Sequence, residues 1–156
     1  MITIEIPGYK TVEGEYLLLD YNGTIARDGR VPEEIKEKIR LLGEQMKIFV
    51  LTADTHGNAA ENLAGLPVTL KTFPKGSALE AKKDILLSLG KDRCIAFGNG
   101  RNDTEMVKNA ALSIGVIDRE GAAGNLLLNA DMVVRDMTEA FEALLHPLRI
   151  VATLRG

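Results

Sequence analysis

The chain has 156 residues, 46% of them hydrophobic, which is enough to bury one sizeable core and leaves little length for a second domain. We therefore expect a single domain over residues 1–156. Acidic and basic residues are mixed along the chain, with a formal net charge of −3, so electrostatics give no reason to expect nucleic acid or a membrane as partner. These features favour a small partner.

No apolar run approaches the ~20 residues needed to span a bilayer. The first ten residues, MITIEIPGYK, alternate polar and apolar side chains and lack the charged start and apolar core of a signal peptide. We therefore expect a cytoplasmic protein. The single cysteine, Cys94, cannot form an internal disulfide, and its apolar neighbours predict a buried core thiol.

Short β-rich runs alternate with amphipathic helical patterns from the start of the chain. The first run, ITIEI, alternates at period two and is expected to pair with the segment near residues 11–13 as a small N-terminal β-hairpin. Residues 15–20, EYLLLD, are apolar almost throughout, which is typical of a strand buried on both faces of a parallel sheet. Residues 31–45 predict a helix, because acidic residues open the segment and apolar residues recur at helical spacing.

The same rhythm continues to the end of the chain, where residues 149–155 fit either a strand or a helix. The other expected strands are 46–52, 68–70, 93–98, 112–117 and 131–134, and the other expected helices are 57–65, 76–90, 103–111, 122–130 and 138–145. Such an alternation predicts an α/β fold, a Rossmann-like three-layer sandwich whose mostly parallel central sheet carries helices on both faces.

Polar residues follow several of these strands, at the edge where ligands bind in parallel sheets. Asp20 ends the first buried strand, Thr52 ends the next, and the segment GNGRNDTEM supplies Asn99, Asn102 and Asp103 after a third. A carboxylate, a hydroxyl and further amide and acidic groups at one edge indicate a catalytic or binding site.

The residue types suit phosphoryl transfer. Asp20 can attack phosphorus, Thr52 and Lys82 can bind the equatorial oxygens, and Mg²⁺ can bridge phosphate and acid. A turn at Gly23 and Thr24 with exposed backbone N–H groups would cradle the phosphate.

Four segments in this order, DYNGT, LTADT, the lysine of KKDILLSLG and GNGRNDTEM, resemble the four motifs of the haloacid dehalogenase-like hydrolases over nearly the whole chain. Within that superfamily the chain most resembles the phosphorylation domain of P-type ATPases and the small soluble proteins similar to it. LTADTHGNA matches the threonine-x-aspartate motif of the pumps, and the spacing of Lys82, Ile85, Leu86 and Leu89 matches their lysine helix. Each motif alone is weak, but all four in order are a strong indication.

The resemblance implies an aspartyl phosphate on Asp20, with Thr52, Ala53 and Lys82 holding the phosphoryl group. Lys83 and Lys75 are the alternatives for the lysine.

The resemblance also implies Mg²⁺ bound by the Asp20 carboxylate, the Asn22 backbone carbonyl and the Asn99 side chain, with Asp103 supporting the site. Most phosphatases of the superfamily have aspartate at both asparagine positions. The first aspartate protonates the leaving oxygen and later activates water, and an amide can do neither. With fewer anionic oxygens, we expect the site to bind Mg²⁺ more weakly.

P-type pumps also lack an acid two residues after the nucleophile, and their leaving group, ADP, is stable without protonation. Asn22 therefore indicates slow dephosphorylation and a preference for activated donors such as acyl phosphates, aryl phosphates or nucleoside triphosphates. The expected partner is a small phosphorylated substrate or a phosphoprotein.

The interval between Asp20 and Thr52 holds one turn, one helix and one strand, and the interval from Thr52 to Lys75 is equally short. Neither leaves room for a cap domain or a nucleotide-binding insertion. A capless site is open to solvent and would serve a large substrate or be covered by a neighbouring subunit, and related capless enzymes assemble into oligomers. We therefore expect a homo-oligomer.

Other interpretations remain open from the sequence. GNGRND could be a tight turn in which Asn102 or Asp103 caps the next helix, and Lys82 and Lys83 could be solvated charges. The protein could also be a catalytically impaired regulatory module that binds a phosphorylated ligand, although a carboxylate at Asp20 adds nothing to anion binding. A two-component receiver would also carry an aspartyl phosphate, but its motifs follow a different order.

Overall fold

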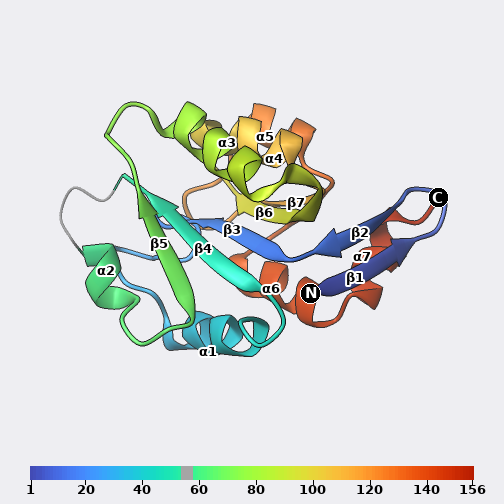
Figure 1. Ribbon diagram of the computed structural model, residues 1–156, viewed down its shortest axis with the longest axis horizontal. Coiled ribbons are helices and arrows are strands. Elements are labelled where there is room, and N and C mark those ends of the chain that lie inside the picture. The colour runs from blue at the N-terminus through green and yellow to red at the C-terminus, as the bar shows by residue number, and fades with distance from the viewer. Residues whose placement is uncertain (54–57) are drawn as a thin grey trace.

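A parallel six-stranded sheet forms the centre of the computed structural model, which describes residues 1–53 and 58–156 (Figure 1). The strands are β1 (Ile2–Ile6), β2 (Lys10–Gly14), β3 (Tyr16–Asp20), β4 (Lys47–Thr52), β5 (Val68–Thr72), β6 (Cys94–Gly98), β7 (Leu112–Val116) and β8 (Met132–Val134). The central sheet has the order β5-β4-β3-β6-β7-β8, and β1 and β2 form a separate antiparallel hairpin. Both the parallel sheet and the added hairpin confirm the sequence prediction.

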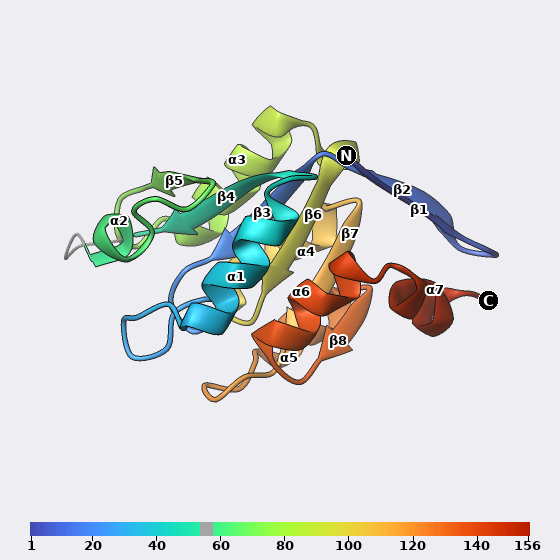
Figure 2. The same ribbon diagram turned by 90° about the horizontal axis from the view of Figure 1, so that it is seen from below.

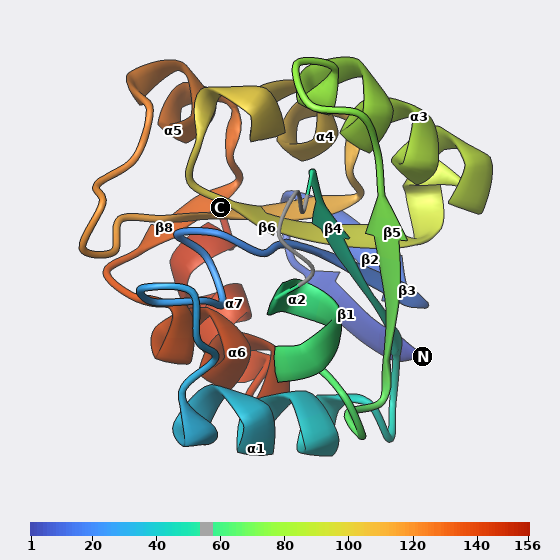
Figure 3. The ribbon, with the colours of Figure 1, turned by 90° about the vertical axis from the view of Figure 1, so that its left-hand side faces the viewer.

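Helices cover both faces of the central sheet. They are α1 (Glu33–Leu42), α2 (Asn58–Asn62), α3 (Ala78–Leu89), α4 (Thr104–Asn109), α5 (Gly124–Asn129), α6 (Met137–Leu145) and α7 (Leu148–Leu154). Figures 2 and 3 show α3, α4 and α5 on one face and α1, α2 and α6 on the other, while α7 lies beside the hairpin. This arrangement is the expected three-layer α/β sandwich.

The middle of the sheet is buried on both sides, as its composition requires. Leu17, Leu18 and Leu19 of β3 are fully buried, and every residue of β6 and β7 is buried. Leu17 and Leu19 face the larger apolar core on the α1 and α6 side, and Leu18 faces the smaller core beneath α3 and α4. The strands that carry the polar residues are therefore held rigidly from both faces.

The hairpin joins the larger core through its apolar face. The isoleucines of β1 are buried, and the chain end returns to the hairpin turn, where the Gly156 N–H donates to the Pro7 carbonyl at 3.0 Å. The ambiguous segment 149–155 is thus resolved as helix α7, and Figure 1 shows the C-terminus at the tip of the hairpin.

Cys94 is fully buried at the start of β6, and burial raises the pKa of its thiol to about 11. This confirms the prediction of a core thiol and argues against a nucleophile, because the reactive form is the thiolate. In the part of the chain that the structure describes, no helix combines the length and apolar character needed to cross a membrane.

Candidate active site

Polar side chains from three neighbouring strands meet at the carboxyl edge of the sheet. Strands β4, β3 and β6 lie side by side and parallel, so the residues that end them share one edge. A pocket of about 250 Å³ opens there. The predicted residues on its wall are Asp20, Asn22, Thr52, Ala53, Lys82 and Asn99. The structure therefore brings together side chains that lie as far apart in sequence as β3 and the turn after β6.

Lys82 lies at the centre of the site and is only 1% exposed. Its Nζ donates to Asp20 Oδ1 at 2.7 Å, to Asp103 Oδ1 at 2.7 Å and to Asn102 Oδ1 at 3.0 Å. The interpretation of Lys82 as a solvated charge is therefore wrong, because helix α3 points this side chain into the protein.

The other two lysines lie elsewhere. Lys83 forms an ion pair with Glu80 at 2.8 Å on the outer face of α3. Lys75 lines a neighbouring pocket rather than the one at Asp20. The geometry thus favours Lys82 over both alternatives as the lysine of the site.

The carboxylate of Asp20 is held in an unfavourable environment for a negative charge. Its side chain is 14% exposed, and burial together with the charge of Asp103 raises the pKa of Asp20 to about 7, although Lys82 opposes the rise. Burial alone would lower the pKa of Lys82, because it disfavours the charged ammonium. The Asp103 and Asp20 carboxylates have the larger opposite effect, so the pKa of Lys82 is raised overall. Two carboxylates and one ammonium leave a net negative charge in a buried site, which is suited to receiving a cation.

Asp103 organises the turn after β6 from a fully buried position. Its Oδ2 accepts from the backbone N–H groups of Asn99 at 3.2 Å and Gly100 at 3.1 Å, while Oδ1 accepts from Lys82. A Cβ on Gly98 would lie 2.7 Å from the Asp103 Cβ, so this position requires glycine. Asp103 makes no side-chain capping bond to α4, but its bond from the Gly100 N–H caps the short 3-10 turn Arg101–Asp103, so it caps this turn and holds Lys82 as well.

Thr24 and Gly23 form the turn beneath Asp20 rather than the open cradle that we expected. The Thr24 hydroxyl lies 3.5 Å from Asp20 Oδ2 and 3.2 Å from Asn99 Oδ1. The Gly23 N–H donates to the Ala26 carbonyl at 3.3 Å and the Thr24 N–H to the Tyr21 carbonyl at 3.4 Å. Both backbone N–H groups are thus engaged inside the turn, and binding a phosphate with them would require exchanging these long bonds.

The threonine-x-aspartate motif is described only in part. Thr52 is buried at the end of β4, and Ala53 follows it on the pocket wall. Asp54, the aspartate of the motif, lies outside the described residues.

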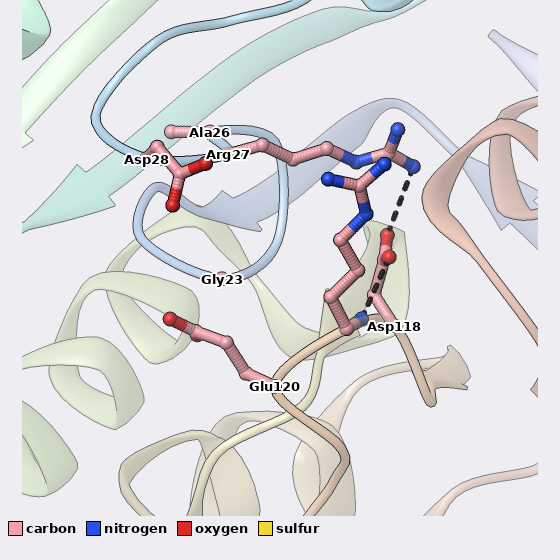
Figure 4. A pocket seen from close by; sticks show the side chains of 7 residues that line it. Gly23, Ala26, Arg27, Asp28, Asp118 and Glu120 are labelled. Carbon is pink, nitrogen blue, oxygen red and sulfur yellow. Dashed lines mark hydrogen bonds and ion pairs between the residues drawn. The ribbon is translucent and has the colours of Figure 1, made fainter.

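Asn102, which the sequence also placed at this edge, lines the pocket as well. The sequence analysis did not anticipate four further wall residues, Phe73, Ala78, Gly100 and Glu120. Glu120 comes from the loop between β7 and α5, and Figure 4 shows its carboxylate beside the turn at Gly23, with the Arg27–Asp118 ion pair on the other side of a small adjoining pocket. Glu120 follows the predicted strand 112–117, at the sheet edge where ligands bind, and this position could have indicated it as a site residue.

A family model described as haloacid dehalogenase-like hydrolase matches residues 58–141, more than half of the chain. The chain belongs to the haloacid dehalogenase-like hydrolases. The uncharacterized protein MJ0073 of Methanocaldococcus jannaschii is 44% identical to this hydrolase over 84 residues, which are 51% of this chain and 90% of that protein. The family resemblance drawn from the motifs is therefore confirmed. The matched segment contains Lys82, Asn99 and Asp103 but begins after Asp20.

Solved structures share the fold of this hydrolase at low sequence identity. The 3-deoxy-D-manno-octulosonate 8-phosphate phosphatase of Moraxella catarrhalis, in complex with magnesium, phosphate and the KDO molecule, has a TM-score of 0.72 and 13% identity, covering 91% of this chain and 94% of that one. The cobalt-bound form of the phosphatase of Haemophilus influenzae has a TM-score of 0.69 and 15% identity, covering 92% and 94%. Each match covers more than 90% of both chains, which confirms the predicted fold without a cap domain.

The oxygen atoms around Asp20 fit Mg²⁺, although few of them are anionic. The Asp20 carboxylate, the Asn22 carbonyl and Asn99 Oδ1 are hard donors, whereas both oxygens of Asp103 are already engaged, which suits a supporting role. Within residues 1–53 and 58–156, no three acidic, histidine or cysteine side chains gather as a metal-binding group. Mg²⁺ commonly retains several waters and needs only one or two carboxylates, so this donor set fits it.

Relative to the wild type, Asp20→Asn should gain stability as the pH of the metal-free protein rises from 4 to 8. The folded state raises the pKa of Asp20 to about 7, so the folded protein holds this proton more tightly than the unfolded chain, and wild-type stability is lost as the pH rises through that value. Asparagine does not titrate. Between pH 4 and pH 8, the unfolding free energy of Asp20→Asn minus that of the wild type should therefore increase by on the order of 3 kcal/mol. Urea denaturation of both proteins in the presence of a chelator measures it. A difference that stays constant across this range would contradict the account.

Proposed function

We propose that this hydrolase is a Mg²⁺-dependent phosphohydrolase or phosphotransferase that acts through an aspartyl phosphate on Asp20. The observation that carries the proposal is the bond of 2.7 Å between Lys82 Nζ and Asp20 Oδ1 at a pocket. A buried carboxylate that meets both a lysine and solvent is placed to act as a nucleophile, because the lysine can neutralise the phosphoryl oxygens that approach it.

In the first step, a carboxylate oxygen of Asp20 attacks phosphorus, the bond from phosphorus to the leaving oxygen breaks, and the leaving group keeps the electron pair. Thr52 and Lys82 lie on the same pocket wall and would bind the equatorial oxygens. Bound Mg²⁺ would neutralise the charge of the phosphoryl group. Asp103 keeps the lysine ammonium in place through its own bond of 2.7 Å.

Asn22 shapes which phosphate donors can react. It lines the pocket two residues after Asp20, where its amide can neither protonate a leaving oxygen nor take a proton from water. Donors whose leaving group is stable without protonation, such as acyl and aryl phosphates or nucleoside triphosphates, should therefore react best. In this preference the proposed chemistry would resemble that of the phosphorylation domain of P-type ATPases more than that of phosphatases of simple sugar phosphates. The exposed mouth of the site suits a small phosphorylated substrate, a phosphoprotein or coverage by a second copy of the chain.

Incubation with Mg²⁺ and acetyl phosphate should form a phosphoryl adduct detected by intact-mass spectrometry. Lys82→Ala should slow its formation by roughly 100-fold or more, because a charged donor to the reacting group is lost. Lys83→Ala removes a neighbouring lysine that faces outward and should leave the rate near that of wild type. Equal rates in the two variants would contradict the role of Lys82. Absence of any adduct and of phosphate release in the wild type would favour a binding or regulatory module.

Turnover of p-nitrophenyl phosphate should exceed that of a sugar phosphate by at least about 10-fold in kcat/KM, because the alkyl leaving group needs a proton that Asn22 cannot give. Asn22→Asp supplies that group and should narrow the gap by accelerating the sugar phosphate. Initial rates of phosphate release measure both. Equal or faster turnover of the sugar phosphate by the wild type would reject the preference.

A further inference from the structure

We propose that Glu120 accepts the proton of the attacking water when the Asp20 phosphoenzyme is hydrolysed. The inference rests on the proposed aspartyl phosphate and names the group that discharges it. No sequence motif contains Glu120, and it comes from the loop between β7 and α5, far along the chain from Asp20.

The pocket wall offers few groups that can take a proton. Among its described residues, Asp20 and Glu120 are the carboxylates, and Asp20 is consumed as the nucleophile. Asn22, Asn99 and Asn102 carry amides, which are not bases at neutral pH. Lys82 is a cation shared by two carboxylates. Glu120 is therefore the remaining carboxylate of this wall within the described residues.

The Glu120 carboxylate lies directly against the turn that follows the nucleophile. A Cβ built on Gly23 would lie 1.9 Å from Glu120 Oε2 and 3.2 Å from Asn99 Nδ2, so the approach depends on glycine at this position. Gly23 adjoins Asn22, and thus the carboxylate lies next to the position whose amide cannot act as a base. Glu120 is exposed and makes no hydrogen bond or ion pair with the described residues, which leaves its oxygens free for water.

Asn99 fixes the loop that carries Glu120. Its Nδ2 donates to the Gly121 carbonyl at 3.4 Å, and its backbone carbonyl accepts from the Ala123 N–H at 2.8 Å. An aspartate at position 99 could still accept from the Ala123 N–H through its backbone carbonyl. It could not donate to the Gly121 carbonyl, because an ionised carboxylate has no hydrogen to donate. The amide at position 99 thus fastens the residue after Glu120 to the end of β6, and Figure 4 shows the carboxylate turned toward Gly23.

In the second step, the water oxygen forms a bond to phosphorus while the bond between phosphorus and the Asp20 oxygen breaks. The electron pair of the broken bond returns to the Asp20 carboxylate. One proton of the water passes to the Glu120 carboxylate and from there to solvent, and inorganic phosphate leaves. No oxidant, reductant or further reactant is needed.

Glu120→Gln tests the inference by separating the two steps. The wild type and the variant are phosphorylated with acetyl phosphate, the donor is removed, and the decay of the adduct is followed by intact-mass spectrometry. Formation should proceed at the wild-type rate, whereas decay should slow by roughly 100-fold, the usual contribution of a general base. Asp28→Asn is the matched control, because Asp28 lines the adjoining pocket beside Glu120 but not the pocket at Asp20. Its decay rate should equal that of the wild type.

Asn22→Asp provides a rescue that a structural role of Glu120 would not show. In that background a carboxylate again stands next to the phosphoenzyme, so Asn22→Asp combined with Glu120→Gln should restore at least most of the lost decay rate. Wild-type decay in Glu120→Gln, or slow decay that the second substitution leaves unchanged, would overturn the inference while the phosphoenzyme itself stands. A wild type that forms no adduct would instead defeat the proposed function on which the inference rests.

Discussion

The site depends on one buried ammonium shared between two carboxylates. Lys82 comes from α3, Asp20 from β3 and Asp103 from the turn after β6, so three separate elements must be packed correctly before the ion pairs can form. Burying three charges costs desolvation energy, and removing one partner of such a group typically costs about 3–5 kcal/mol because the others are left unpaired. Such a pairing need not add net stability, and under the proposed function it prepares the Asp20 carboxylate to act as the nucleophile.

Two asparagines, Asn22 and Asn99, give this site fewer negative charges and fewer proton donors than a site with aspartates at both positions would have. The amide at Asn22 removes a proton donor beside the nucleophile, and the amide at Asn99 replaces a charge with a hydrogen-bond donor that holds the Gly121 loop. We infer that Asn99 compensates in part for the missing acid at position 22, because the loop that Asn99 holds presents the Glu120 carboxylate beside Gly23. Under the proposed function, an open pocket with few anionic metal ligands and a base from a separate loop would be consistent with a phosphoenzyme that persists.

Much of this arrangement could be predicted from the sequence, because parallel strands bring their carboxyl ends to one edge and the polar residues stand there. The choice between Lys82 and Lys83 could not, since adjacent helical residues point in different directions and only packing decides which one is buried. Glu120 was missed because its approach depends on a loop held by hydrogen bonds from Asn99, which no local pattern records. The engaged N–H group of Gly23 likewise depends on the detailed path of a turn.

The central claim is that Asp20 becomes phosphorylated, and locating the modified residue tests it most directly. Borohydride reduces an aspartyl phosphate to homoserine, which peptide mass spectrometry can place in the chain after treatment with Mg²⁺ and a phosphoryl donor. The account predicts homoserine at position 20 and an unmodified Asp103, whose carboxylate is fully buried. Homoserine at Asp103 or at any acidic residue other than Asp20, or phosphate release with no trapped residue, would contradict it.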